Sequence, residues 1–254
     1  MLNFVVGDIH GCVDEFCDLL LRIHHKAQFE NVKEVKVWSL GDELDRGPDS
    51  EAVCALVFDN EGHLTMESTE VQILSIQSNH SEKFVRWARH QEVQREGGKA
   101  NPMKMKPEWP NLLRFAANFE SLPMWRRPDS GELLVHGGIE PAMKGLCSSD
   151  FYKCSKVDKN ILRTRYVNPQ GRMVYLGDEK PEDRFWSEVY DGRFGKVLYG
   201  HQPFDTVRYD SFAVGLDNGV VFGGTLTALC IETDELIQVK AKRQYAEHYS
   251  KESE

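Results

Sequence analysis

The chain has 254 residues, and 31 Lys and Arg set against 40 Asp and Glu give a formal net charge of −9. With 41% hydrophobic and 28% charged residues, the composition is typical of a globular protein and excludes the disordered and low-complexity classes. No apolar run approaches the roughly 18 residues of a membrane span, and the apolar start of the chain is too short for a signal peptide. We therefore expect a cytoplasmic protein without membrane contact. The acidic balance also argues against an extensive nucleic-acid-binding surface.

Three strand–loop–helix units follow one another in the first 90 residues. Apolar runs predict three strands, at residues 2–6, 35–40 and 71–76. Apolar residues at helical spacing predict a helix from Val13, a second helix that Asp49 or Ser50 caps and that runs to Phe58, and a third that Ser81 caps. A polar loop follows each predicted strand. In α/β sheets such loops converge at one rigid edge, where ligand sites gather.

Two more apolar runs, at residues 133–135 and 196–199, end in the same way, at His136-Gly137-Gly138 and at Gly200-His201. Two long segments between these elements, 88–111 and 144–193, show no clean period and predict surface excursions over the site.

The end of the chain predicts a meander of short strands, at residues 212–216, 225–232 and 236–239. Residues 1–240 are expected to form a single domain, and residues 241–254 a frayed polar tail.

The chemistry-bearing residues lie in the loops that follow the predicted strands. They are Asp8, His10, Asp42, Asn79, His80, His136 and His201. Each one alone fits a tight turn, a helix start or a histidine bound to a backbone carbonyl. Together they place an imidazole, carboxylate or amide after every candidate core strand, and these are ligands of divalent metals. Seven such side chains are too many for one ion, so the pattern predicts two metals that share a carboxylate.

These motifs carry a family resemblance. They are Gly7-Asp8-Ile9-His10-Gly11, Gly41-Asp42-Glu43-Leu44-Asp45-Arg46-Gly47, Asn79-His80, His136-Gly137-Gly138 and Gly200-His201. In this order they resemble the calcineurin-like metallophosphoesterases, in the phosphoprotein phosphatase branch, over residues 2–245. Residues 161–166 and 216–229 are similar to the bacterial symmetrical dinucleoside tetraphosphatases and to the phosphatase domain of bacterial polynucleotide kinase-phosphatase. The resemblance implies a four-layer α/β/β/α sandwich, with two mixed sheets flanked by helices, formed by residues 1–240.

The resemblance also implies a ligand set. Asp8, His10 and Asp42 would hold one metal, and Asn79, His136 and His201 would hold the second, with Asp42 as the bridge. Two such ions lower the pKa of a bridging water and supply a hydroxide that attacks phosphorus in line. Mn²⁺ suits this mixed nitrogen and oxygen set, with Fe, Zn²⁺ and Ni²⁺ as alternatives.

Further roles follow from the same resemblance. His80 would protonate the leaving oxygen, and Asp45 would orient its imidazole. Arg46 would clamp two phosphate oxygens, with Asn79 also contacting substrate. Arg163 or Arg165 is the candidate for a second clamp. Asp217 is expected to orient one of these arginines.

Asn218 and Val220 stand where relatives often have Thr and Cys, and three residues beside the predicted ligands also depart from the family pattern. Ser78 stands where the family has glycine, which matters only if the backbone there needs a positive φ. Ser81 stands where the family has a glutamate, so a carboxylate is lost and a helix cap is gained. Glu43 adds a carboxylate beside the bridging aspartate. It either alters the metal preference or points away from the metals.

The sequence thus predicts a dimetal hydrolase of phosphoesters or phosphoanhydrides, acting on dinucleoside tetraphosphates or on small phosphomonoesters. A protein serine/threonine phosphatase with a phosphoprotein substrate is the first alternative, because it would use the same metal site. A catalytically silent phosphate-binding module is the second. The presence of His80, Asp45 and Arg46 argues against that module, since binding alone needs no general acid.

Overall fold

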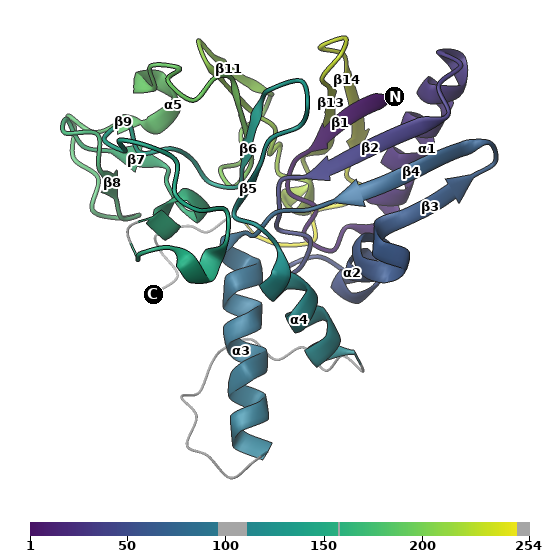
Figure 1. The fold of residues 1–254 in the computed structure, drawn as a ribbon, viewed down its shortest axis with the longest axis horizontal. Coiled ribbons are helices and arrows are strands. Elements are labelled where there is room, and N and C mark those ends of the chain that lie inside the picture. The colour runs from purple at the N-terminus through teal and green to yellow at the C-terminus, as the bar shows by residue number, and fades with distance from the viewer. Residues whose placement is uncertain (96–110, 157, 248–254) are drawn as a thin grey trace.

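The computed structural model describes residues 1–95, 111–156 and 158–247, and two mixed β-sheets form its centre (Figure 1). The first sheet has six strands in the order β14 (Leu236–Lys240), β13 (Thr225–Cys230), β1 (Leu2–Val6), β2 (Glu34–Ser39), β4 (Thr69–Leu74) and β3 (His63–Met66). Strands β1, β2 and β4 run parallel, whereas β13, β14 and β3 pair antiparallel with their neighbours. The parallel strands therefore release their loops at one common edge.

The second sheet has five strands in the order β11 (Arg208–Asp210), β12 (Ala213–Gly215), β10 (Val197–Tyr199), β6 (Leu133–Val135) and β5 (Trp125–Arg126). Strands β6, β10 and β12 are parallel. A small third sheet contains β8 (Met173–Val174), β7 (Tyr166–Val167) and β9 (Arg184–Phe185).

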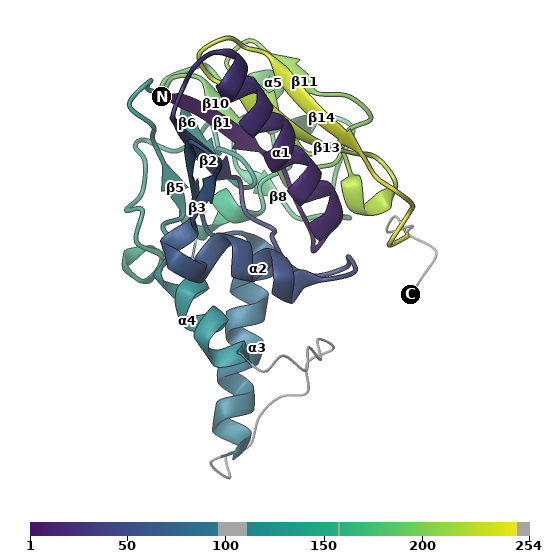
Figure 2. The same ribbon diagram turned by 90° about the vertical axis from the view of Figure 1, so that its right-hand side faces the viewer.

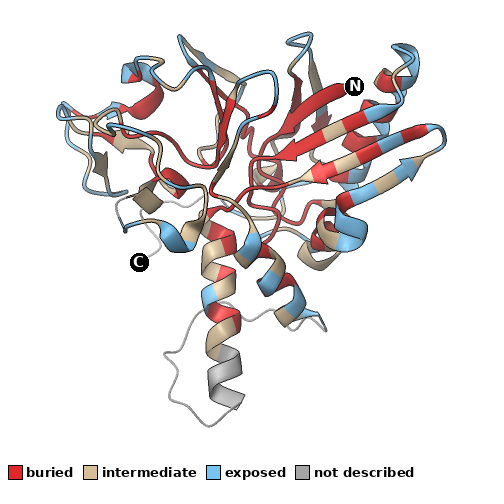
Figure 3. Cartoon of the chain, viewed as in Figure 1, coloured by how far each residue is buried: buried red, intermediate tan, exposed pale blue. Residues whose placement is uncertain are grey.

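The two large sheets pack face to face. Val5 and Trp38 from the first sheet share a buried cluster with Leu134, Leu198 and Val214 from the second. The opposite face of β1, which carries Phe4 and Val6, belongs to a second cluster with helix α1 (Val13–Phe29). Because both faces of these strands are buried, they read in the sequence as continuous apolar runs. Figure 3 shows that burial continues from the strands into the loops where they end.

Five α-helices are present in the described part of the chain. They are α1 (Val13–Phe29), α2 (Ser50–Phe58), α3 (Asn79–Arg95), α4 (Leu112–Ser121) and α5 (Trp186–Val189). Helix α1 lies across the outer face of the six-stranded sheet, against β13 and β14 (Figure 2). Helices α3 and α4 pack on each other and project away from the sheets (Figure 1). None of the described helices is both long and apolar enough to cross a bilayer.

The predicted fold class, two mixed sheets with flanking helices, is confirmed. The outer layer of the second sheet is built differently from the first. There the segment 144–193 contributes the three-stranded sheet and α5, with the short 3-10 helices Phe151–Lys153 and Asp158–Leu162. Trp186 and Phe185 of this segment pack with Leu133 and Val197 of the sheet. The predicted excursion is therefore a folded layer that apolar contacts stabilise. The many charged residues of this segment made those contacts hard to predict from the sequence.

Other predictions need correction. The three C-terminal strands do not form one meander, because β12 pairs with β10 in the second sheet while β13 and β14 form a hairpin in the first. The predicted excursion at 88–111 begins too early, since α3 continues to Arg95; residues 96–110 lie outside the described residues.

The predicted tail also begins later than residue 241. Tyr245 donates to Glu15 on α1, with 2.8 Å between the oxygens, and the backbone nitrogens of Tyr245 and Ala246 donate to Val221. Residues 248–254 lie outside the described part of the chain.

Candidate metal centre

The strand-end loops of both sheets converge on one buried cluster. Asp8 and His10 follow β1, Asp42 follows β2, Asn79 and His80 open α3, His136 follows β6 and His201 follows β10. Two sets of side chains bring their ligand atoms within 4.8 Å of one another: His10, Asp42 and His80, and Asp42, His136 and His201. Asp42 belongs to both sets. This is the arrangement expected of a carboxylate shared by two ions.

Distances from Asp42 define the geometry of the cluster. Its Oδ2 lies 3.5 Å from His10 Nε2, 3.5 Å from His136 Nε2 and 3.8 Å from His80 Nε2. Asp8 Oδ2 lies 3.9 Å from His10 Nε2, and Asn79 Oδ1 lies 2.7 Å from His136 Nε2. The structure thus brings the six predicted ligands together.

Backbone carbonyls orient two of the imidazoles. The Nδ1 atom of His10 lies 3.1 Å from the carbonyl oxygen of Leu44, and Nδ1 of His136 lies 2.8 Å from that of Leu40. A ring N–H donated to a carbonyl fixes the tautomer and leaves the Nε2 lone pair facing Asp42. The loops that carry the ligands therefore also orient them.

The backbone of this region is strained at functional positions. His10, Asp42, Asp45, Arg46 and His201 all have positive φ values, between 48° and 77°. Such φ values are rare for residues other than glycine and persist only where the surrounding structure holds them. Here the tight loops turn each polar side chain back toward the point where the two sheets meet.

Burial sets the charge states in the cluster. Burial and the neighbouring carboxylates of Asp217 and Asp42 raise the pKa of Asp8 well above its usual range. Burial would also raise the pKa of Asp42, but the facing imidazoles hold that pKa well below its usual range. Burial lowers the pKa of His10 to about 3 and that of His201 well below its ordinary value. Neutral imidazoles beside crowded carboxylates form a donor set that a cation would stabilise.

One buried atom tests whether these residues fit a metal. His201 Nε2 is buried and, among the described residues, has no hydrogen-bond partner. A buried polar atom without a partner lowers the stability of the fold, so the unpaired Nε2 atom indicates that it binds a ligand such as a metal ion. Imidazole nitrogen, carboxylate and amide oxygen together suit borderline to hard divalent ions. The residues therefore fit the predicted metals.

His80 has its predicted neighbour. Its Nδ1 lies 2.7 Å from Asp45 Oδ2, and Lys83 Nζ lies 3.6 Å from the same oxygen. Burial would raise the pKa of Asp45, but the hydrogen bond and charge of His80 hold it well below the usual range. Arg46 donates to His10 Nε2 at 2.9 Å and lies over the ring of Phe222. The three predicted catalytic residues thus border the predicted ligands.

The structure separates the two candidate arginines. Arg165 is half-buried and donates to Gln202 at 2.8 Å and to the carbonyl oxygen of His201 at 3.3 Å. Arg163 instead forms an ion pair with Glu82 on α3. Arg165 is therefore the arginine at the metal centre.

Sequence reasoning missed Gln202, although it directly follows a predicted ligand and adjacency was the available signal. Asp217 Oδ1 accepts a hydrogen bond from the Gly219 backbone nitrogen at 2.9 Å. Among the described residues no ion pair within 4 Å joins Asp217 to Arg163 or Arg165, but Asp217 lies close enough for its charge to interact with Arg46 and Arg165, and these arginines lower the pKa of Asp217 against the effect of burial.

The three departures from the family pattern have structural explanations. Glu43 points away from the metal ligands: its Oε1 accepts hydrogen bonds from Ser39 and Ser75. Ser78 has no positive φ. It caps α3 in place of Ser81, since the Ser81 nitrogen donates to Ser78 Oγ at 3.1 Å and the Ser78 nitrogen to Ser81 Oγ at 2.8 Å. This reciprocal pair is a capping box with serine in the position of the usual glutamate.

Two packed sheets with His and Asp side chains at their strand ends form a cluster that could hold divalent metal ions. The model of the calcineurin-like phosphoesterase family matches residues 4–227, and the chain belongs to this family.

Curated relatives point the same way. The chain is 30% identical over 242 residues to "Bis(5'-nucleosyl)-tetraphosphatase PrpE [asymmetrical]" of Geobacillus thermodenitrificans, covering 89% of this chain and 88% of the relative. It is 25% identical to the protein of the same name from Halalkalibacterium halodurans, covering 94% of each. The names of both relatives include the word "asymmetrical", whereas the sequence motifs resemble those of the symmetrical enzymes.

Solved structures share the fold. A "putative diadenosine tetraphosphatase" superposes with a TM-score of 0.66 at 20% identity, covering 94% of this chain and 93% of the other. A cold-active protein-tyrosine phosphatase of a Shewanella species superposes with a TM-score of 0.56 at 14% identity, covering 95% and 80%. At these identities the likeness supports the fold alone.

Proposed function

We propose that this protein hydrolyses dinucleoside tetraphosphates with two divalent metal ions. One observation carries the proposal: the carboxylate of Asp42 belongs to two ligand clusters whose other members come from both sheets. In this assignment His80 of the first cluster is the general acid, and Asp8, whose Oδ2 lies 3.9 Å from His10 Nε2, holds one ion together with His10 and Asp42. Asn79, His136 and His201 hold the other, with Asp42 between them.

Two divalent ions, when bound, activate a water molecule and neutralise the charge that develops on the phosphoryl group. The chain supplies the remaining parts. His80 donates a proton to the leaving oxygen. The Asp45 carboxylate, 2.7 Å from His80 Nδ1, holds the imidazole ring in its orientation. Arg46 and Arg165 clamp the phosphate oxygens, because a guanidinium presents two parallel donors to a phosphate. Burial of the whole cluster strengthens these interactions.

The relatives' names favour the substrate class and the position of cleavage. An asymmetrical split of diadenosine tetraphosphate yields ATP and AMP, whereas a symmetrical split yields two ADP. We propose the asymmetrical split, on the strength of relatives that cover nine tenths of the chain. We also propose a cytoplasmic location for the enzyme. Mn²⁺ is the proposed metal, since an amide oxygen among imidazoles and carboxylates suits it.

Product analysis tests the proposal. Purified protein is stripped of metal, reloaded with Mn²⁺, incubated with diadenosine tetraphosphate, and the products are separated by chromatography. We expect ATP and AMP in equal amounts. Two equivalents of ADP would contradict the asymmetrical split. Intact tetraphosphate beside rapid hydrolysis of an aryl phosphate or of phosphopeptides would contradict the substrate class, and the phosphopeptide result would favour a protein phosphatase.

A further inference from the structure

A second pocket, rich in basic side chains, lies beside the metal centre. It has a volume of about 410 Å³, and Arg86, Lys156, Lys159 and Arg163 line it together with the aromatic rings of Phe151 and Tyr175. Four cations in one pocket are notable in a chain whose net charge is −9. A concentration of positive charge in a concave site raises the local concentration of anions.

The positive charge of this pocket is only partly neutralised. Glu82 is the one carboxylate among its described lining residues, and it pairs with both Arg86 and Arg163. Lys159 lies 3.8 Å above the ring of Phe151. Within the described residues, Lys156 forms no ion pair and is exposed. Two lysines are therefore available to an anionic ligand without breaking an existing pair.

The walls of the pocket continue directly from the metal centre. Glu82 and Arg86 lie on α3, which begins with the predicted ligand Asn79 and with His80. On the other wall, Ile161 precedes Arg163, and its carbonyl oxygen accepts hydrogen bonds from the two glycines that follow the ligand His136, at 2.9 and 3.1 Å. Asn79, Glu82 and Arg86 are spaced i, i+3 and i+7 and therefore share one face of α3, so the pocket continues from the predicted ligand Asn79.

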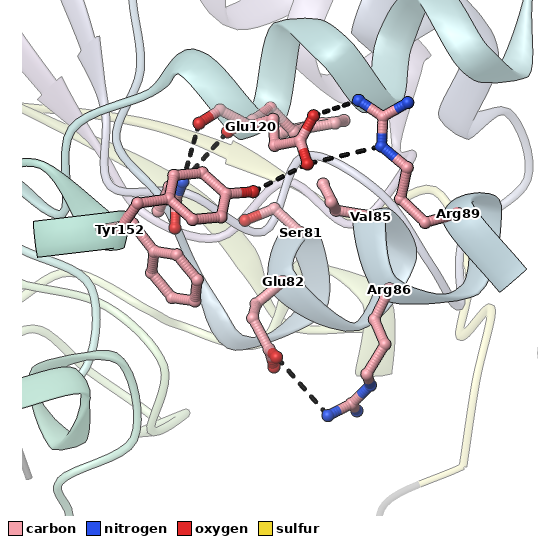
Figure 4. Close-up of a pocket in the computed structure, with 10 residues that line it drawn as sticks. Ser81, Glu82, Val85, Arg86, Arg89, Glu120 and Tyr152 are labelled. Atoms are coloured by element: carbon pink, nitrogen blue, oxygen red, sulfur yellow. Dashed lines mark hydrogen bonds and ion pairs between the residues drawn. The ribbon is translucent and has the colours of Figure 1, made fainter. Parts of the chain in front are cut away.

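A neighbouring pocket provides a contrast. It lies between α3 and α4 and shares Glu82, Arg86 and Phe151 with the basic pocket. Its own cation Arg89 is neutralised, because Arg89 pairs with Glu120, which also accepts a hydrogen bond from Tyr152 at 2.7 Å (Figure 4). Figure 4 shows Glu82 and Arg86 on the opposite side of α3 from this pair. The excess of positive charge thus lies on the face that continues from the metal centre.

We infer that the basic pocket binds a chain of phosphates, and that in catalysis it holds the phosphates of the substrate that lie beyond the reacting one. This inference rests on the proposed function for its catalytic role. Ammonium groups bind phosphate oxygens as point charges, and the exposed ring of Tyr175 offers a face for a nucleobase. A small aryl phosphate carries nothing beyond its leaving oxygen that can reach the lysines.

The test replaces both lysines and compares two substrates. Lys156→Gln with Lys159→Gln removes two charges and keeps most of each side chain. The control, Lys153→Gln with Lys196→Gln, removes two charges from lysines that pair with Asp150 and Asp234 and do not line the pocket. Metal content and melting temperature are measured for each protein. For each, kcat and KM are determined with diadenosine tetraphosphate and with an aryl phosphate.

We expect the ratio of kcat/KM for tetraphosphate to kcat/KM for aryl phosphate to fall about tenfold in the pocket variant, mainly through KM. The control should keep the wild-type ratio. An unchanged ratio in the pocket variant overturns the inference, as does an equal fall in the control, because net charge alone would then explain it.

A separate result would show that the proposed function has failed instead. If the wild type leaves tetraphosphate intact, binding of inorganic tripolyphosphate to metal-free protein decides the pocket's role by calorimetry. Binding that weakens about tenfold in the pocket variant alone supports a phosphate-chain site. Equal binding by the wild type and the pocket variant overturns it.

Discussion

Replacing Gly200 by alanine should displace a metal ligand without disturbing the fold. Gly200 links β10 to His201, and a Cβ built on it would lie 2.2 Å from Asp8 Oδ1. Ordinary van der Waals contact begins near 3.4 Å, so the Asp8 carboxylate has to move by about 1 Å. The move also disrupts the hydrogen bonds from the His201 nitrogen to both oxygens of Asp8, at 3.0 and 3.1 Å. The φ of Gly200 is not positive, so the backbone accepts alanine.

A ligand misplaced by about 1 Å costs on the order of 100-fold in rate, and loss of a supporting contact weakens metal binding about 10- to 100-fold. The assay is Mn²⁺ binding by calorimetry together with aryl phosphate hydrolysis, with circular dichroism to verify the fold. Gly145→Ala is the matched control, because a Cβ there meets nothing within 4 Å and its φ is not positive. If Gly200→Ala binds Mn²⁺ and turns over like the wild type, Asp8 is not a ligand in the way proposed.

Three further predictions concern the acid, the buried glutamate and the helix cap. His80→Gln should lower kcat about 100-fold on tetraphosphate, and less on an aryl phosphate whose leaving group needs no acid, while His63→Gln on β3 leaves kinetics unchanged. Burial raises the pKa of Glu43 to about 6 from 4.5, so its contribution to stability is present below pH 4.5 and is lost as pH rises through 6. In metal-free protein, the free energy of unfolding of Glu43→Gln minus that of the wild type should therefore increase by about 2 kcal/mol when the pH is raised from 4 to 8, as measured by denaturant unfolding. A difference that does not change with pH would refute this. Ser78→Ala removes the cap of α3 and should lower the free energy of unfolding by about 1 kcal/mol, whereas Ser121→Ala should change it far less.

Much of the site could be predicted because its residues stand at strand ends. A strand that is buried on both faces is a short apolar run in sequence, and the residue after it enters the edge where loops converge. That reasoning located Asp8, Asp42 and His136 without knowledge of how the strands pair. It did not place β12, since a short apolar run such as 213–215 predicts a strand but not its partner.

Side-chain direction was the part that the sequence left open. Arg163 and Arg165 are two residues apart, and the sequence does not show which of them points to the metal centre. Their packing partners in the fold determine this. Glu82 pairs with Arg163, while Gln202 and the His201 carbonyl hold Arg165 at the centre. Glu43 was equally ambiguous, because the serines that turn it away come from two separate strand ends, at 39 and 75.

The central claim, that Asp42 is shared by two metal ions, is tested most directly by metal stoichiometry. Metal-free protein is titrated with Mn²⁺, and the bound metal is counted per chain for the wild type and for Asp42→Asn. The account predicts two ions per chain in the wild type and a loss of tight binding of both in the variant, because one carboxylate serves both positions. A single ion per wild-type chain, or two ions retained by Asp42→Asn, would contradict it.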